Sequence, residues 1–223
     1  MVGFINPIII PFIKQNVYQY ICQIGVSEGK DTDKLLRVQN VHLTLIDPCL
    51  DEDLVSKYRN YPNVEVCKGL SLEILPTMKK SYDCILIDGD HNWFTVFNEL
   101  IAIEAMNLLR NGGAIFLHDV SRPYGRRDMY YLPDTIPPSY VHPYAKDSGY
   151  ATALHENGPK NGVLTAVEDF VNQQNEMYMF LKFDVFHGLG LLVKQHAKKT
   201  RIIFLQWLIM SMFINQITKL IRS

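Results

Sequence analysis

Cysteine is scarce in this sequence, and its spacing argues against a structural zinc site. The four cysteines lie in or beside apolar runs, without a CxxC pair or the mixed Cys/His spacing that such a site needs. We therefore predict a cytoplasmic protein in which all four thiols stay reduced: Cys22, Cys49, Cys67 and Cys84.

An excess of charge of either sign is also missing. The chain of 223 residues has 22 Lys and Arg residues against 23 Asp and Glu residues, and its isoelectric point is about 6.6. No overall field is then available to attract nucleic acid. We predict no nucleic-acid partner and expect any recognition of anions to be local.

Long apolar runs are lacking at both ends of the sequence. The N-terminal apolar patch is interrupted by Pro7 and Pro11 and has neither a basic start nor a small-residue cleavage site, so we predict no signal peptide. Near the C-terminus, the apolar run 202–214 is shorter than the ~20 residues that a membrane-spanning helix needs.

Residues 195–223 nevertheless form an apolar appendage with two open interpretations. Basic residues flank the apolar run, which suits a helix lying in a membrane interface. A helix that is apolar nearly all round suits equally a homo-oligomer interface or packing on the domain, and we favour protein contact because the polar face is thin. The expected location is cytoplasmic, or membrane-peripheral through the basic residues Lys198, Lys199, Arg201, Lys219 and Arg222.

The sequence does contain a regular alternation of short apolar runs and longer amphipathic stretches. This alternation is typical of a parallel sheet covered by helices, and we predict a doubly wound α/β domain over residues 1–194. The predicted parallel strands are Tyr20–Ile24, His42–Ile46, Val64–Cys67, Cys84–Ile87 and Ala114–Leu117.

The second half of the domain contains the clearest helix and a hairpin. Apolar residues recur every three or four positions from Trp93 to Leu109, where "RNGG" supplies a glycine stop. A shorter helix is predicted over Val163–Asn172. The two apolar runs that follow are joined by "HGLG", so the last strand should be antiparallel to the one before it. The aperiodic segment from Val120 to Asn161 predicts a lid or binding loop.

A cofactor site is indicated where the first predicted strand runs into glycine. Gly25 and Gly29 precede a helix start, an arrangement that lets backbone N–H groups approach an anionic ligand. Asp47 ends the next strand, ~20 residues further on, where an acid can bind ribose hydroxyls. Together they predict a ribose-bearing cofactor. The structural alternative is that the glycines only form a turn and that Asp47 is a helix cap or a turn residue before Pro48.

The fourth and fifth predicted strands both end in acid and histidine. Asp88, Asp90 and His91 follow the fourth strand, and His118 and Asp119 follow the fifth. Because ligands bind beyond the carboxyl ends of strands in open parallel sheets, these groups should share a rim with the glycine turn. Carboxylates and imidazole there suit Mg²⁺ or Mn²⁺. The structural alternative is that Asp90 caps the next helix and His118 packs under the long segment.

As an ordered set, these motifs resemble class I S-adenosylmethionine (SAM)-dependent methyltransferases. The resemblance covers about Tyr20 to Lys194 and extends to the family called methyltransferase type 24 and to metal-dependent sugar O-methyltransferases. The glycine turn has the G-x-x-x-G form and not the G-x-G-x-x-G form of NAD sites. The motifs are "QIGVSEGKDT", "LIDP", "CKGLSLEILP", "ILIDGDHNW", "LLRNGGAIFLHDV" and the final hairpin.

The resemblance implies a seven-stranded, mostly parallel sheet with an antiparallel last strand. It also implies that the methionine part of SAM lies on the glycine turn, that Asp47 holds the ribose and that Ser71 lies near the adenine. Gln23 and Leu70 depart from the family pattern, in which acids are common at both positions. The implied cofactor-binding residues are Gly25, Val26, Ser27, Glu28, Gly29, Thr32, Asp47, Ser71 and Asp88.

The same resemblance implies a divalent ion and a base. Similar metal-dependent methyltransferases hold the ion with acidic or amide side chains after the fourth and fifth strands. Asp88, His118 and Asp119 are therefore the implied ligands of Mg²⁺ or Mn²⁺, and His118 departs from the commoner acid. Methyl transfer to a hydroxyl also needs a proton acceptor, a task that suits imidazole. His91 is the predicted catalytic base, with helix capping as its alternative role.

The predicted function is methyl transfer from SAM to a hydroxyl of a sugar or glycan precursor. The long segment after Val120 offers cationic and aromatic side chains to such an acceptor, and a solvated loop is the alternative for each of them. Two other functions stay open: a catalytically silent binding module, and a hydroxylase-like or oxidoreductase enzyme on the same frame. The candidate acceptor-binding residues are Arg122, Tyr124, Arg126, Arg127, Tyr130 and Tyr131.

Overall fold

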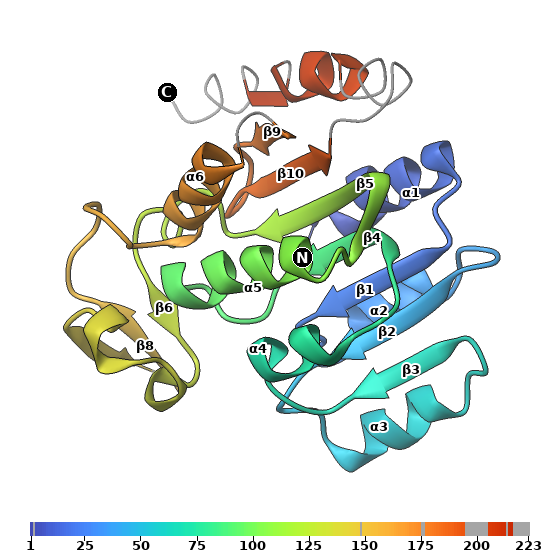
Figure 1. Cartoon of the computed structure of the whole chain (residues 1–223), viewed down its shortest axis with the longest axis horizontal. Coiled ribbons are helices and arrows are strands. Elements are labelled where there is room, and N and C mark those ends of the chain that lie inside the picture. Colours follow the sequence, from blue (N-terminus) through green and yellow to red (C-terminus); the bar gives the residue numbers. More distant parts are fainter. Residues whose placement is uncertain (2, 148, 175–176, 195–204, 213, 216–223) are drawn as a thin grey trace.

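A seven-stranded sheet lies at the centre of the computed structural model (Figure 1). The structure describes residues 1, 3–147, 149–174, 177–194, 205–212 and 214–215. The strand order is β3-β2-β1-β4-β5-β10-β9, with β1 to β5 parallel and β10 antiparallel to both of its neighbours. This arrangement confirms the predicted fold and its antiparallel final strand. The strands are β1 Tyr20–Ile24, β2 His42–Ile46, β3 Val64–Cys67, β4 Tyr82–Ile87, β5 Leu109–His118, β9 Tyr178–Phe183 and β10 Leu189–Lys194.

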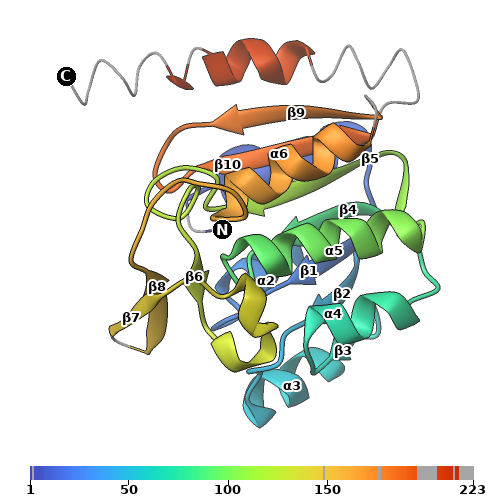
Figure 2. The same cartoon turned by 60° about the vertical axis from the view of Figure 1, so that its left-hand side comes forward.

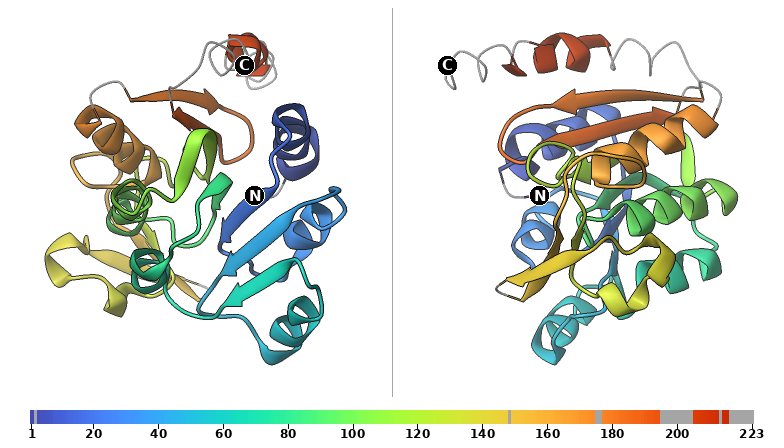
Figure 3. Two further views of the ribbon diagram at one scale, coloured as in Figure 1. Left: turned by 45° about the vertical axis from the view of Figure 1, so that its right-hand side comes forward. Right: turned by 90° about the vertical axis from the view of Figure 1, so that its left-hand side faces the viewer.

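Helices cover both faces of this sheet (Figure 3). Buried apolar side chains of α1, α2 and α3 pack on one face, and those of α5 and α6 pack on the other. The central strands are apolar on both faces because each face is covered, as expected for parallel strands. The helices are α1 Ile10–Asn16, α2 Lys30–Leu35, α3 Glu52–Arg59, α4 Ser71–Ile74, α5 Trp93–Ala105 and α6 Val163–Gln173.

Helix α5 ends at Ala105, so the predicted end at Leu109 is wrong. Asn107 has a left-handed backbone with φ of 50°, which the helix cannot continue through. The N–H of Leu108 turns back to the carbonyl of Ile103. The chain then enters β5, so "RNGG" lies inside a strand and is not the stop of the helix.

An N-terminal helix was not predicted, because Pro7 and Pro11 suggested an interrupted patch. The structure has a π-helical turn over Ile5–Ile9 that leads directly into α1. Pro11 lies in the first turn of α1, where the missing N–H is not needed for the helix. Phe12 and Ile13 of α1 are buried against the sheet.

Residues 205–212 are helical, lie next to β9 (Figure 2) and contact α1. Trp207 is buried against Phe12 and Phe183, and its indole N–H donates to Oε1 of Gln15 at 3.2 Å. Among the described residues, no helix is both long and apolar enough to cross a membrane. The flanking basic residues named above, 198, 199, 201, 219 and 222, lie outside the described part of the chain.

The long segment between β5 and α6 is more ordered than its sequence suggests. It contains a small antiparallel sheet in the order β6-β8-β7. Its strands are short: β6 Met129–Tyr130, β7 Tyr144–Asp147 and β8 Tyr150–Ala153. This small sheet lies on the side of the large sheet toward which the parallel strands point (Figure 1). The segment therefore borders the edge at which ligands bind in such sheets.

Replacing Lys194 by methionine should destabilise the end of the large sheet. Nζ of the buried Lys194 in β10 donates to both carboxylate oxygens of Glu104 in α5, at 2.9 and 2.8 Å. Its loss leaves a partly buried carboxylate without its cation, so Lys194→Met should lower the free energy of unfolding by ~2–4 kcal/mol in chemical denaturation. Lys80→Met is the matched control, because Lys80 pairs with Glu65 at 2.6 Å on the surface. The control should cost less than ~1 kcal/mol, and equal losses in both variants would contradict this role of Lys194.

Candidate active site

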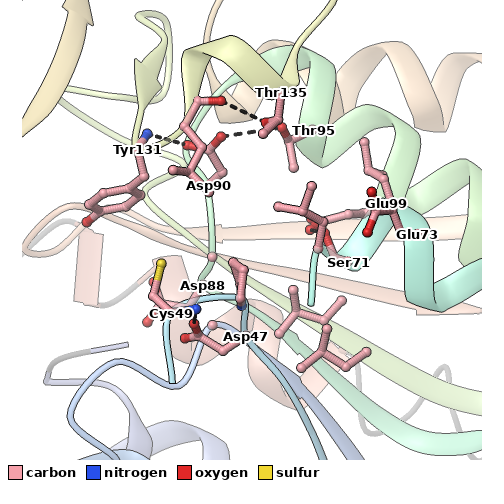
Figure 4. A pocket seen from close by; sticks show the side chains of 18 of the residues that line it. Asp47, Cys49, Ser71, Glu73, Asp88, Asp90, Thr95, Glu99, Tyr131 and Thr135 are labelled. Atoms are coloured by element: carbon pink, nitrogen blue, oxygen red, sulfur yellow. Dashed lines mark hydrogen bonds between the residues drawn. The ribbon is translucent and has the colours of Figure 1, made fainter. Parts of the chain in front are cut away.

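A cavity of about 390 Å³ opens beyond the carboxyl ends of the parallel strands (Figure 4). Its walls come from the loops after β1, β2, β3 and β4, from α4 and α5, and from residues 131–136. This is the edge at which the sequence places the glycine turn and the acid and histidine residues. The volume is that of a small-molecule site.

The glycine turn after β1 lies in direct backbone contact with the end of β4. Gly25 has φ of 85°, and a Cβ atom there would lie 2.1 Å from the carbonyl oxygen of Asp88. The N–H of Asp88 also donates to the carbonyl of Ile24 at 2.8 Å. Only glycine fits this approach, so the position of the turn and the position of Asp88 are coupled.

Asp47 fixes the glycine turn through its carboxylate. Oδ2 of Asp47 accepts the N–H groups of Val26 and Ser27 at 2.8 and 3.1 Å. Oδ1 accepts the N–H of Cys49 at 2.7 Å, which closes the turn after β2. Asp47 thus has the turn role that its sequence alternative described, and it also lines the cavity.

The predicted cofactor-binding residues divide into two groups. Val26 is buried in the core, and the exposed Glu28 pairs with Lys30. The carbonyl of Gly29 accepts the hydroxyl of Tyr58, and the buried Thr32 donates to Gln23 at 2.8 Å, so both support the turn from behind. Five of the predicted residues line the cavity: Gly25, Ser27, Asp47, Ser71 and Asp88.

Glu99 also lines the cavity and was missed by the sequence reasoning. It lies on the buried face of α5, where Val96, Leu100 and Ile103 are apolar. Ser71 donates to its Oε1 at 2.5 Å. An acid in the apolar stripe of a helix was the signal that could have identified it.

Asp88, His91, His118 and Asp119 form a cluster at the rim of the cavity. Nδ1 of His118 lies 3.0 Å from Oδ1 of Asp88 and 3.3 Å from Oδ1 of Asp119. Nδ1 of His91 lies 3.0 Å from Oδ2 of Asp119. Asp88 belongs to both the cavity and the cluster, so the two are contiguous.

Asp119 combines a left-handed backbone with a carboxyl group whose pKa is lowered by its neighbours. Its backbone is left-handed, with φ of 60°, which aspartate tolerates better than most residues. Burial alone would raise the pKa of this carboxyl, but hydrogen bonds from His118 and His91 outweigh burial and lower the pKa. Asp119 is therefore a carboxylate at neutral pH, able to orient His91 through Nδ1.

The cluster has the donor set of a divalent-metal site. One ligand atom from each of Asp88, His91 and His118 lies within 4.8 Å of the others. This set differs from the predicted one by having His91 in place of Asp119. Within the described residues, Nε2 of His118 is buried and has no hydrogen-bond partner, while Oδ2 of Asp88 pairs with the amino group of Met1. Nδ1 of His118, with a carboxylate oxygen of Asp88 and one of Asp119 within 3.3 Å, is the nitrogen whose surroundings fit metal ligation.

The structural alternatives for the acid and histidine residues can also be compared with the geometry. Asn92, and not Asp90, caps α5, because its Oδ1 accepts the N–H of Thr95 at 2.8 Å. Asp90 instead accepts the N–H of Tyr131 at 3.1 Å and ties the long segment to the rim. His118 packs against the ring of Phe4, at 5.9 Å between ring centres.

The predicted acceptor-binding residues do not all face the cluster. The rings of Tyr124 and Tyr131 lie 6.2 and 5.9 Å from the ring of His91. Tyr130 is buried and donates its hydroxyl to Asp128. Arg126 forms a bidentate ion pair with Glu168 in α6. Arg122 and Arg127 lie 3.7 and 3.9 Å from the carboxylate of Glu156. Tyr124 and Tyr131 are therefore the predicted acceptor residues that lie beside the candidate base.

Comparison with solved structures shows proteins of the same fold. A proposed caffeoyl-CoA O-methyltransferase from Staphylococcus aureus has a TM-score of 0.56 and 17% identity, over 87% of this chain and 85% of that chain. A Burkholderia thailandensis 1,6-didemethyltoxoflavin-N1-methyltransferase, with 1,6-didemethyltoxoflavin and S-adenosylhomocysteine (SAH) bound, has a TM-score of 0.57 and 14% identity, over 86% and 78%. An SAH-bound methyltransferase from Podospora anserina has a TM-score of 0.53 and 16% identity, over 84% and 76%.

Comparison of the sequence itself points to the same class. No curated protein matches the sequence. Residues 22–120 match the family model for a methyltransferase domain of type 24. This range begins in β1 and ends just after β5, so it includes the glycine turn, Asp47 and the acid and histidine cluster. Residues 22–120 are therefore similar to this methyltransferase family, and the chain has the fold of class I SAM-dependent methyltransferases.

Proposed function

We propose that the protein transfers the methyl group of SAM to a hydroxyl of a sugar or glycan precursor, with His91 as base. The observation that carries this proposal is the pairing of His91 with Asp119 at the rim of the cavity, at 3.0 Å. A histidine oriented by a carboxylate next to a cofactor site is the arrangement that general-base catalysis requires.

SAM would occupy the cavity with its methionine part on the glycine turn and its adenosine between Asp47 and Ser71. Backbone N–H groups at the start of α2 and the left-handed Gly25 and Ser27 favour an anionic carboxylate at that end. Asp47 has one further acceptor position for a ribose hydroxyl, since its two oxygens accept three N–H groups in all.

The base chemistry follows from the tautomer that Asp119 selects. His91 donates its Nδ1–H to Asp119, so Nε2 carries the lone pair that can accept a proton. As the hydroxyl oxygen attacks the methyl carbon, the O–C bond forms and the S–C bond of the sulfonium breaks, which releases SAH. The hydroxyl proton moves to Nε2 of His91. Asp119 stabilises the imidazolium that results.

The ligands that we propose for Mg²⁺ or Mn²⁺ are Asp88, His118 and Asp119. When bound, the ion would act as a Lewis acid toward the acceptor oxygens. His118 would contribute Nδ1, which lies 3.3 Å from Oδ1 of Asp119. Asp88 would contribute Oδ1, 3.0 Å from the same nitrogen, and His91 stays available as base.

The acceptor would lie against the tyrosines beside His91. Tyr124, Tyr131 and Tyr150 come from the long segment and surround this side of the rim, with Tyr131 and Tyr150 at 6.4 Å between ring centres. Burial, with a hydrogen bond that Tyr124 donates to Tyr150, raises the pKa of Tyr124 to about 12. Burial also raises the pKa of Tyr131, so Tyr124 and Tyr131 are neutral at physiological pH. The three rings offer apolar faces and hydroxyls to a sugar ring.

Asp47→Asn should weaken binding of SAH. Asparagine has one side-chain oxygen, so it cannot accept N–H groups at both positions that Oδ1 and Oδ2 of Asp47 occupy. At least one backbone N–H therefore loses its partner, and the turn becomes less ordered. We expect an affinity loss of ~1–3 kcal/mol by calorimetry, the range for hydrogen bonds to a charged acceptor. Asp51→Asn is the control, because Asp51 accepts only the N–H of Leu54 as a helix cap, which asparagine can replace. Unchanged affinity in Asp47→Asn would remove Asp47 from the site.

His91→Gln should lower turnover of labelled SAM with a panel of nucleotide sugars by ~10²-fold or more, because glutamine cannot accept the proton. SAH affinity should stay the same, since His91 lies outside the cavity wall. His42→Gln is the control, because His42 is exposed at the start of β2 and stacks on Tyr20. Wild-type turnover in His91→Gln would refute its role as base.

Removal of divalent ions tests the metal. EDTA should abolish turnover, Mg²⁺ or Mn²⁺ should restore it, and His118→Ala should lose this rescue together with Mn²⁺ binding measured by calorimetry. The exposed His155 supplies the control His155→Ala, which should keep both. Full activity in EDTA would disprove the metal requirement.

A further inference from the structure

Glu99 places a buried carboxyl group in the wall of the cavity, at the end formed by α4 and α5 (Figure 4). Its side chain is 1% exposed. Oε1 accepts the hydroxyl of Ser71. Among the described residues, Oε2 is buried and has no hydrogen-bond partner. A buried polar atom without a partner is costly, so a partner supplied by a ligand would offset that cost.

The charge state of Glu99 decides what this atom can offer. Burial is the largest cause that raises the pKa of Glu99, and the negative charge of Asp90 raises it further. The hydrogen bond from Ser71 lowers this pKa, but the net result is a value of about 8. The carboxyl is therefore mostly protonated at pH 7. Because Oε1 already accepts the hydroxyl of Ser71, the proton belongs on Oε2, which makes Oε2 a hydrogen-bond donor.

The position of Glu99 matches one end of the cofactor. Asp47 and Asp88 lie on one side of the cavity, and Ser71 and Glu99 lie on the other (Figure 4). With the ribose at Asp47, the adenine ring extends toward Ser71. The edge of adenine opposite the ribose bond carries N1, an acceptor without a hydrogen. A donor at the far wall is complementary to that atom.

We propose that Glu99 determines the specificity of the cavity for adenine, with Oε2 of the neutral carboxyl donating to N1 and Ser71 holding the carboxyl in place. This inference rests on the proposed function, in which the cavity binds SAM. A purely structural acid would instead serve only as the acceptor for Ser71 and would be insensitive to the base in the cavity.

The test compares two ligands that differ at one atom: SAH, and S-(1-deazaadenosyl)homocysteine, in which N1 is replaced by C–H. Calorimetry on the wild-type protein should find the deaza compound bound about 10-fold more weakly, the effect of one lost hydrogen bond at a buried donor. Glu99→Leu should bind both compounds equally, because its affinity for SAH should fall to that for the deaza compound. Glu99→Gln should keep the preference, because its amide N–H replaces the donor.

Glu73→Gln is the matched control, because Glu73 lines the same cavity but is exposed. Its preference for SAH should equal that of the wild type. If Glu99→Leu does not fold, Glu99→Met is the second variant with the same expected loss.

Two outcomes would overturn the role of Glu99. Equal binding of both compounds by the wild type would do so, and so would an unchanged preference in a folded Glu99→Leu or Glu99→Met variant. Failure of the wild type to bind either compound would instead overturn the SAM site itself, so the two failures are distinguishable.

Discussion

The carboxylate of Asp47 determines the geometry on which the rest of the site depends. It accepts three backbone N–H groups, two from the turn after β1 and one from the turn after β2. The turn that it holds brings Gly25 against the carbonyl of Asp88, with no room for a side chain between them. Asp88 in turn faces His118. One buried acceptor thus connects the ends of β1, β2 and β4 and aligns the cavity with the acid and histidine cluster.

The two ends of the cavity differ in the charge that they hold. At the rim, hydrogen bonds from the histidines outweigh burial and lower the pKa of Asp119, so its carboxyl group stays ionised and can stabilise a cation or an imidazolium. At the far wall, burial raises the pKa of Glu99, and the carboxyl stays neutral. Two carboxyl groups therefore have opposite charge states, because Asp119 lies beside imidazoles and Glu99 is enclosed by apolar side chains.

Features that depend on local pattern could be predicted, and features that depend on tertiary placement could not. The limits of β1, β2 and β3 follow from short apolar runs closed by polar residues, and the parallel arrangement brings the polar ends of β4 and β5 together. The pairing of His91 with Asp119 depends on side-chain direction, which sequence spacing does not set. The sequence marks Glu99 only as an acid in the apolar stripe of a helix, and its partner Ser71 is set by the tertiary placement of α4. The small sheet β6-β8-β7 has strands too short for a periodic signal.

The position of β10 has a consequence for how the chain reaches its native state. Among the described residues, β10 is the last strand along the chain, yet it lies between β5 and β9 and not at the edge. Until the hairpin of β9 and β10 docks, the apolar β5 is an unpaired edge, a surface prone to association with other chains. During synthesis, the ribosome exposes β5 long before β10, so chaperone protection of this edge would matter most in that interval.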